Sequence, residues 1–238
     1  MENLVNPLTA LDIAQMIDIS AVRTDSTDQK ILEMVNVARK YHCYLVTILP
    51  SQTSRTKALL QQYPDAPKLG GNVGLPSGGH TTTVKVKEAR ELVTMGVDEI
   101  DMVIDVAAHL SGRYDDVYRD MAAVVEAAEG KPVKIILECY YLNDTQIRMG
   151  CDLAIKAGAR FVKTGTGWAP SGATLENIAL IKRHVGDAVK IKASGGVRGV
   201  ESLLEMYRRG ASRFGISASS AAGILDQLES LPQPIVLR

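Results

Sequence analysis

The sequence predicts an α/β protein built as a single-domain (β/α)8 barrel of the TIM type. Eight short apolar runs recur along the chain, and their starts lie roughly 24 to 34 residues apart, which is room for one strand, one helix and two short loops. Strict alternation of strands and helices implies a parallel sheet with right-handed crossovers. Eight such units in 238 residues favour a closed barrel. We therefore expect one barrel domain over residues 1–238.

The predicted strands are the apolar runs themselves. In chain order they are Met16–Ser20, Tyr44–Leu49, Leu69–Leu75, Glu99–Ile104, Val133–Glu138, Arg160–Thr164, Val189–Ser194 and Arg213–Ser217. An open doubly wound sheet is the alternative, because it has the same alternation of elements. That fold often carries a GxGxxG turn after its first strand. This chain has no such turn, which favours the barrel.

The predicted helices combine a capping residue at the start with a glycine near the end. The first follows the segment DSTD at 25–28 and has Leu32, Val35 and Ala38 on one face. The others are Thr82–Leu92, Tyr114–Ala128, a helix from Asn143 to near Gly158, Thr174–His184, Val200–Arg209 and one beginning near Ala218.

Charge and hydrophobicity restrict the classes of partner. Lys plus Arg and Asp plus Glu number 27 each, which argues against a broad electrostatic grip on nucleic acid or on an anionic membrane. No run approaches the roughly 18 apolar residues that span a membrane, and the first residues lack the pattern of a secretory signal. We expect a cytoplasmic protein without nucleic-acid or membrane partners. A homodimer is the commonest default for its assembly.

Cysteine and histidine usage argues against a metal centre. Cys43, Cys139 and Cys151 cannot all pair within one chain, and none lies in a CxxC motif, so neither a zinc site nor a disulfide framework is indicated. The simple interpretation is a reducing compartment. The four histidines show no metal-ligand spacing. We expect no metal and no cofactor, and we expect Cys43 and Cys139 to be inert core thiols.

Two lysines interrupt strand-like runs and point to covalent chemistry. Lys163 lies in ARFVKTGTG and Lys192 in AVKIKASGG, and each is followed at once by small residues. Lysine is almost never fully buried unless it is paired or used, and burial lowers the pKa of its ammonium group. A partly neutral amine can attack a carbonyl carbon. These runs therefore favour an enzyme that works through a Schiff base.

Strand alternation brings more charges to the same place. If the polar faces of the strands point into the barrel, Asp101 and Lys134 converge with Lys163 and Lys192. We expect the three cations to lower one another's pKa, and Asp101 to carry protons. The alternative is an internal salt-bridge network that only fills the barrel. Four charged residues on four strands favour chemistry.

Small polar residues after the last strands predict an anion site. The segment GTG at 165–167 follows the sixth strand, SGG at 194–196 follows the seventh, and Ser217 ends the eighth. Glycines let backbone amides approach an anion, and a helix N-terminus adds partial positive charge. The loops after strands seven and eight are the usual phosphate site of this architecture. The alternative is that the glycines only make turns. Asp18 is either a substrate contact or a buried cap, and Trp168 either a pocket wall or a loop anchor.

Several long motifs resemble the deoxyribose-phosphate aldolase family. They are GLPSGGHTTTVKVKEA, DEIDMVID, VKIILE, FVKTGTGW followed by SGAT, and KASGGVR, in the family's order from about Ile13 to Ser217. The resemblance implies a class I aldolase on a (β/α)8 barrel. Such an enzyme cleaves 2-deoxy-D-ribose 5-phosphate to D-glyceraldehyde 3-phosphate and acetaldehyde without a metal. The partner it implies is a small phosphorylated sugar or aldehyde.

The resemblance also implies roles for single residues. Lys163 matches the Schiff-base lysine, and Lys192 the second lysine that lowers its pKa. Asp101 and Lys134 match the members of a proton relay. Together with the reasoning from the strands, it leads us to expect substrate contacts from Asp18, Ser20, Thr47, Thr166, Gly167, Gly195, Gly196 and Ser217.

Departures from the family pattern leave the substrate open. The family usually has Asp-His-Thr in its first strand, a cysteine in its second, the motifs DMVIN and KTSTG, and paired serines after its last strand. At these positions the chain has Ile19, Ser20, Thr47, Asp105, Gly165 and Ala218. The alternative substrates are another phosphorylated ketose or a donor larger than acetaldehyde, as in a transaldolase. A non-catalytic sugar-phosphate sensor, or an isomerase with Glu138 as its base, ranks lower.

Overall fold

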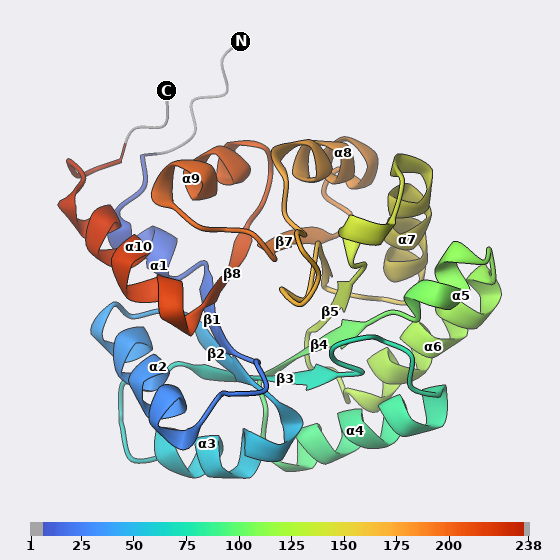
Figure 1. Ribbon diagram of the computed structural model, residues 1–238, viewed down its shortest axis with the longest axis horizontal. Coiled ribbons are helices and arrows are strands. Elements are labelled where there is room, and N and C mark those ends of the chain that lie inside the picture. The colour runs from blue at the N-terminus through green and yellow to red at the C-terminus, as the bar shows by residue number, and fades with distance from the viewer. Residues whose placement is uncertain (1–6, 236–238) are drawn as a thin grey trace.

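Eight parallel strands close into a barrel, each hydrogen-bonded to the next and the last to the first (Figure 1). The computed structural model describes residues 7–235. The strands are β1 (Ile17–Ala21), β2 (Leu45–Ile48), β3 (Lys68–Val73), β4 (Glu99–Val103), β5 (Val133–Ile136), β6 (Phe161–Lys163), β7 (Lys190–Ser194) and β8 (Arg213–Ser217). The predicted (β/α)8 barrel is confirmed. The predicted strand ends differ from the observed ones by at most about two residues.

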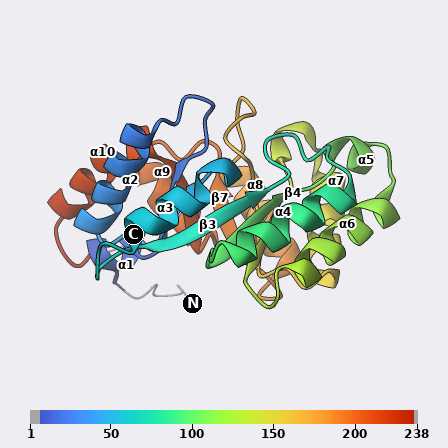
Figure 2. The same cartoon turned by 90° about the horizontal axis from the view of Figure 1, so that it is seen from below.

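The longer helices form a layer around the outside of the barrel, as Figure 2 shows for the side that carries β3. They are α2 (Asp28–Lys40), α3 (Thr53–Leu60), α4 (Thr82–Thr94), α6 (Tyr114–Ala127), α7 (Asp144–Lys156), α8 (Leu175–Val185), α9 (Val200–Arg208) and α10 (Ala218–Ser230). The side chains of Thr27, Asn143 and Thr174 each accept the backbone N–H three residues on, which caps α2, α7 and α8. None of the helices within residues 7–235 has the length and apolar character needed to cross a membrane.

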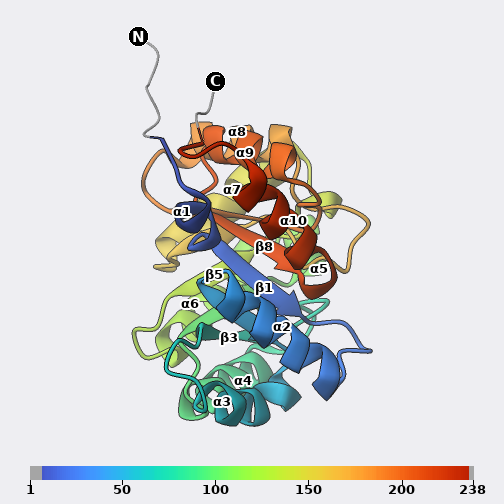
Figure 3. The same cartoon turned by 90° about the vertical axis from the view of Figure 1, so that its left-hand side faces the viewer.

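Several short helical segments are absent from the sequence-based prediction. They are α1 (Ala10–Ala14), the 3-10 turns η1 (Pro50–Gln52) and η2 (Cys139–Tyr141), α5 (Val106–Leu110) and the eight-residue helix α3. Local polar contacts cap two of them: Thr9 and Asp12 form a capping box at α1, and Asp105 accepts the backbone N–H of Ala108 at α5. Helix α1 lies at the start of β1, away from its arrowhead (Figure 3).

Alternate residues of each strand face two different environments. In β4, Ile100 and Met102 join the apolar layer that packs beneath the helices. Their neighbours Glu99 and Asp101 are also buried, but they form ion pairs with side chains of other strands. The outer face of the sheet is therefore apolar, and the interior of the barrel is charged.

Candidate active site

Buried charged side chains from most of the strands meet inside the barrel. They are Asp18 (β1), Glu99 and Asp101 (β4), Lys134 (β5), Lys163 (β6), Lys192 (β7) and Arg213 (β8). Parallel pairing sets their order, because Asp101 lies opposite Lys134 and Lys163 lies opposite Lys192 in the sheet register. We call these seven residues the charge network.

Asp101 is the centre of the charge network. Its carboxylate accepts hydrogen bonds from the Nζ atoms of Lys134 at 2.8 Å, Lys163 at 2.7 Å and Lys192 at 2.8 Å. The structure thus brings together the four side chains that strand alternation placed on one face. The three ammonium groups share one carboxylate, so the proton of each depends on the others.

Further acids and an arginine complete the network. Lys192 Nζ lies 2.5 Å from Asp18, and Arg213 donates to the other oxygen of Asp18 at 2.9 Å. Glu99 lies 2.6 Å from Lys134 and 3.5 Å from Arg213. The sequence analysis missed Glu99 and Arg213 as partners. The signal was present for both, since Glu99 shares the face of Asp101 and Arg213 shares the face of Ser217 at alternate positions.

The network gives the lysines different pKa values. Burial lowers the pKa of Lys163 to about 8; its contact with Asp101 opposes this shift, while repulsion by Lys192 and Lys134 adds to it. Burial also disfavours the charge of Lys134, but Asp101, Asp18 and Glu99 outweigh it and raise the pKa of Lys134 above its usual value. The expectation that all three lysines would have lowered pKa values is therefore wrong for Lys134, because it contacts several carboxylates rather than one.

Asp101 and Asp18 stay ionised. Burial alone would raise the pKa of Asp101, yet Lys134, Lys163 and Lys192 hold it well below its usual value. The pKa of Asp18 is lowered in the same way by its cationic neighbours. Among the three lysines, Lys163 is the most accessible: its side chain is 6% exposed, against 1% for Lys192 and 0% for Lys134. It is also the last residue of β6, at the end of the barrel where the loops converge.

A cavity of about 180 Å³ lies among the loops that follow β1, β6, β7 and β8. Six of the predicted substrate contacts line it: Ser20, Thr166, Gly167, Gly195, Gly196 and Ser217. Gly195 has a φ of 80° and Gly196 a φ of 134°, so the turn after β7 adopts a left-handed backbone that favours glycine. We call this cavity the phosphate pocket, after the anion site that the sequence predicts at these loops. Its lining also includes Arg23 and Arg198, which the sequence analysis did not select.

Two predicted contacts do not line the phosphate pocket. Asp18 is fully buried, and both of its oxygens are engaged by Lys192 and Arg213. Thr47 is 3% exposed, and its hydroxyl accepts a hydrogen bond from the amide of Asn72 at 2.9 Å. Asp18 therefore has the role of a buried partner for cations, and Thr47 that of a support for Asn72 across β2 and β3.

Glu138 explains one of the departures from the family motifs. It has a left-handed backbone, and its carboxylate accepts hydrogen bonds from the backbone N–H and the hydroxyl of Thr166. A Cβ atom at Gly165 would lie 2.9 Å from this carboxylate and 3.0 Å from the Cα of Gly172. The side chain of Glu138 thus fills the space that a residue larger than glycine would need. Burial raises the pKa of this carboxyl.

Trp168 is a loop anchor. Its indole N–H donates to the backbone oxygen of Val22 at 3.1 Å, and its backbone N–H donates to the hydroxyl of Thr166 at 2.9 Å. The guanidinium of Arg23 lies 4.5 Å from the centre of the indole ring. These contacts hold the loop after β6 against the loop after β1.

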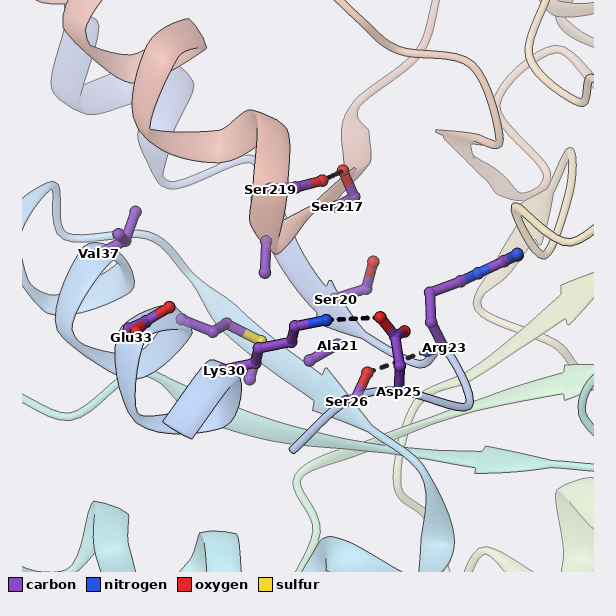
Figure 4. A pocket seen from close by; sticks show the side chains of 12 residues that line it. Ser20, Ala21, Arg23, Asp25, Ser26, Lys30, Glu33, Val37, Ser217 and Ser219 are labelled. Atoms are coloured by element: carbon purple, nitrogen blue, oxygen red, sulfur yellow. Dashed lines mark hydrogen bonds and ion pairs between the residues drawn. The ribbon is translucent and has the colours of Figure 1, made fainter. Parts of the chain in front are cut away.

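A second, larger cavity of about 620 Å³ lies between α2 and the start of α10 (Figure 4). It shares Ser20, Arg23 and Ser217 with the phosphate pocket, and the ion pair between Lys30 and Asp25 lies along its wall. No member of the charge network lines it. No member of the charge network lines the smaller cavity either, but that cavity holds six of the predicted substrate contacts, against only Ser20 and Ser217 in the larger one.

The cysteines contribute no nucleophile. Cys43, Cys139 and Cys151 are buried and free, and burial raises the thiol pKa of Cys43 and Cys151 to about 12. Burial raises the pKa of Cys139 as well. Within residues 7–235, His, Cys, Asp and Glu side chains form no group of three or more that could hold a metal ion.

Comparisons with known proteins agree with this geometry. The family model described as DeoC/LacD family aldolase matches residues 13–225. The deoxyribose-phosphate aldolase of Klebsiella pneumoniae is 41% identical over 221 residues, which are 92% of this chain and 89% of that protein. The deoxyribose-phosphate aldolase of Sinorhizobium medicae is 42% identical over 226 residues, which are 94% of this chain and 90% of that protein.

Solved structures give the same result. The aldolase QR15 is 33% identical with a TM-score of 0.84, covering 91% of this chain and 95% of its own. A putative deoxyribose-phosphate aldolase from Coccidioides immitis is 31% identical with a TM-score of 0.86, covering 95% and 91%. Family model, sequence and fold agree over nearly the whole length. The chain belongs to the DeoC/LacD family of aldolases.

Proposed function

We propose that this enzyme cleaves 2-deoxy-D-ribose 5-phosphate to D-glyceraldehyde 3-phosphate and acetaldehyde through a Schiff base on Lys163. The observation that carries the proposal is the state of Lys163. It is the most accessible of the three lysines that share Asp101, and its pKa is lowered to about 8. A lysine in that range supplies enough neutral amine near neutral pH to attack an aldehyde. The names of the relatives at about 40% identity support the choice of substrate.

The reaction depends on converting the amine of Lys163 into an iminium ion, which then acts as the electron sink. Neutral Lys163 attacks C1 of the open-chain sugar, and loss of water from the carbinolamine gives an iminium ion. A base removes the proton of the C3 hydroxyl, the C2–C3 bond breaks, and its electron pair moves into the iminium to form an enamine. D-Glyceraldehyde 3-phosphate leaves. Protonation of the enamine and hydrolysis of the resulting iminium release acetaldehyde and restore Lys163.

Asp101 is placed to couple these proton movements. It accepts a hydrogen bond from Lys163 at 2.7 Å, and the Lys163 ammonium is one of the three cations that hold its pKa down. Loss of the proton from Lys163 therefore makes Asp101 more basic. We assign Asp101, with Lys134 beside it, to proton transfer through a water molecule. We assign Lys192 to the repulsion that keeps Lys163 partly neutral.

The phosphate pocket fixes the other end of the substrate. Backbone groups of the glycine turns after β6 and β7 face a cavity that also contains Ser217 at the start of α10. A phosphate bound there directs the sugar chain toward β6. C1 is then held close to the amine of Lys163, and the attack becomes effectively unimolecular. We infer that Ser20, Thr166, Gly167, Gly195, Gly196 and Ser217 bind this phosphate or the adjacent hydroxyls.

Two of the departures from the family motifs have structural explanations and do not favour a different substrate. The extra carboxylate at Asp105 caps α5 by accepting the N–H of Ala108 at 2.9 Å, so it already has a structural partner. Gly165 leaves room for Glu138. A panel of phosphorylated ketoses and 2-deoxysugars, scored by released aldehyde, tests the choice. Faster cleavage of any ketose phosphate than of 2-deoxyribose 5-phosphate would overturn it.

Alanine substitutions of the buried Lys163 and of an exposed lysine test the mechanism. We expect Lys163→Ala to lose cleavage of 2-deoxyribose 5-phosphate by at least about 1,000-fold, because Lys163 is the most accessible of the three lysines that share Asp101. The matched control is Lys190→Ala, which removes an exposed lysine at the opposite end of β7. It should retain activity. Full turnover in Lys163→Ala would rule the scheme out.

For the assembly, we propose a homodimer. A relative from Aeropyrum pernix, 28% identical with a TM-score of 0.85 and covering 93% of each chain, is described as having a unique tetrameric structure. The mass in solution, measured by sedimentation equilibrium, distinguishes a dimer of this chain from a monomer or a tetramer.

A further inference from the structure

A pair of reciprocal contacts joins the loop after β1 to the loop after β6. Trp168 donates its indole N–H to Val22 at 3.1 Å, and Arg23 donates to the backbone oxygen of Gly167 at 3.2 Å. The guanidinium of Arg23 also lies 4.5 Å from the centre of the Trp168 ring. One loop therefore anchors the tryptophan, and the tryptophan and its neighbour hold the arginine in return.

This arrangement fixes Arg23 at the boundary between two cavities. Arg23 lines both the phosphate pocket of about 180 Å³ and the larger cavity of about 620 Å³. Figure 4 shows its side chain extending away from the ion pair of Lys30 with Asp25. A planar guanidinium stacked on an aromatic ring loses little freedom when it binds an anion, because its position is already set.

The charge of Arg23 is available for a ligand. In the part of the chain that the structure describes, no Asp or Glu oxygen lies within the 4.0 Å ion-pair distance of Arg23. Asp25, two residues further on, is paired with Lys30 at 2.5 Å. The glycine turns and the start of α10 offer only partial charges, and Arg198 is the other arginine in the lining of the pocket. A sugar phosphate brings nearly two negative charges. A full positive charge beside the pocket is what such a ligand requires.

We propose that Arg23, positioned by Trp168, is a specificity-determining residue that binds the phosphate group of the substrate. The proposal rests on the proposed function and adds the group that makes the enzyme select phosphorylated over free 2-deoxysugars. Guanidinium groups bind phosphate through paired, charge-assisted hydrogen bonds. Arg23 lies far along the chain from the glycine loops. The contacts of the loop after β1 with Gly167 and Trp168 bring it to the phosphate pocket.

The test is the selectivity of the Arg23→Ala variant. We expect its KM for 2-deoxyribose 5-phosphate to rise at least about tenfold and its kcat to change by less than about twofold. Cleavage of unphosphorylated 2-deoxyribose should be unchanged. Arg23→Lys should be intermediate, since it keeps the charge but loses the planar fork. Inorganic phosphate should inhibit the wild type competitively, with an inhibition constant that rises in Arg23→Ala.

Matched variants separate this role from a structural one. Arg39→Ala removes an arginine that stacks 3.7 Å from the ring of Tyr63 and pairs with Asp65 on the outside of the barrel, so it should leave both substrates unaffected. Trp168→Phe keeps an aromatic ring but loses the hydrogen bond to Val22. It should raise KM for the phosphorylated sugar and leave kcat unchanged.

Failure of this inference is distinguishable from failure of the proposed function. A wild type that neither cleaves 2-deoxyribose 5-phosphate nor forms a borohydride-trapped adduct with acetaldehyde would refute the function, and calorimetric binding of inorganic phosphate would then decide the role of Arg23. An active wild type with an unchanged KM in Arg23→Ala overturns the inference. Should Arg23→Ala fail to fold, unchanged KM values in both Arg23→Lys and Trp168→Phe overturn it.

Discussion

Lys134 and Lys163 lie on adjacent strands and contact the same carboxylate, yet their pKa values move in opposite directions. Lys134 has Asp101 at 2.8 Å, Glu99 at 2.6 Å and Asp18 at 3.9 Å, so negative charge surrounds it. Lys163 has Asp101 alone and is repelled by Lys192. The number of carboxylates around each amine, rather than burial alone, decides which lysine can be neutral.

The lowered pKa of Lys163 predicts the pH dependence of the reaction. The amine is reactive only when neutral, and its pKa is about 8, so kcat/KM should rise with pH and level off above about pH 8. Below that value the rate should fall about tenfold per pH unit. A pH profile of kcat/KM for 2-deoxyribose 5-phosphate checks this. A kcat/KM that has already reached its plateau below about pH 7 would contradict this prediction.

Removal of the central carboxylate should affect both stability and activity. Asp101→Asn leaves Lys134, Lys163 and Lys192 without their shared anion in a buried site. Lys134 keeps Glu99 and Lys192 keeps Asp18, but Lys163 loses its ion-pair partner. We expect a loss of about 3 to 5 kcal/mol in the free energy of unfolding, measured with denaturant, because removing one partner from a buried ion-pair network is costly. Activity should fall by at least about 100-fold.

The control for this variant is an exposed acid with a similar contact. Asp187 accepts a hydrogen bond from Lys182 at 2.7 Å, but its side chain is 98% exposed. Asp187→Asn should leave the unfolding midpoint where it is. Equal effects of the two substitutions would show that Asp101 has no special place in the barrel.

At the scale of elements, the sequence was most informative where a segment is long or buried on both faces. All eight strands were predicted, because their apolar runs are bounded by polar loops and glycines. Helices α2 and α7 were predicted from their caps at Thr27 and Asn143. Helix α3 has no side-chain cap, and α1 and α5 span only five residues each, so the sequence pattern gave too little signal to predict them.

The loop after β6 was predicted as part of an anion site, but the contacts that support the loop were not predicted. Glu138 reaches this loop from the end of β5, and a single sequence does not indicate which loop its carboxylate will meet. The same holds for Arg23, which approaches from the loop after β1. Contacts between loops depend on barrel closure, and no local pattern encodes them.

Gly165 gives a prediction at this scale. Gly165→Ser restores the common family residue, but its Cβ atom would lie 2.9 Å from Glu138 and 3.0 Å from Gly172. The loop must then move, and we expect a loss of about 1 to 3 kcal/mol in unfolding free energy. Because this loop lines the phosphate pocket, the KM for the phosphorylated sugar should also rise. The control is Gly223→Ser, where a Cβ atom meets nothing within 4 Å. Unchanged stability and KM in Gly165→Ser would refute the role assigned to Glu138.

At the scale of the whole molecule, barrel closure makes the site. Asp101 in β4 reaches Lys192 in β7, and Arg213 in β8 reaches both Asp18 in β1 and Glu99 in β4. Strand alternation predicted that Asp101, Lys134, Lys163 and Lys192 share a cavity. It could not assign the pairing, because Glu99 and Arg213 join only once the sheet closes on itself. The full set of ion-pair partners is therefore known only from the closed barrel, whereas the reactive amine was predicted from the sequence.

The central claim is that Lys163, among the three lysines that share Asp101, is the accessible and partly neutral amine that forms the iminium. Borohydride reduction in the presence of acetaldehyde tests it most directly, because the reduced adduct survives digestion as N-ethyl-lysine and can be located by mass spectrometry. We predict modification of the peptide that contains Lys163, at a yield that increases with pH toward about 8. An adduct formed mainly on Lys192 or Lys134, or the absence of any adduct under turnover conditions, would contradict the account.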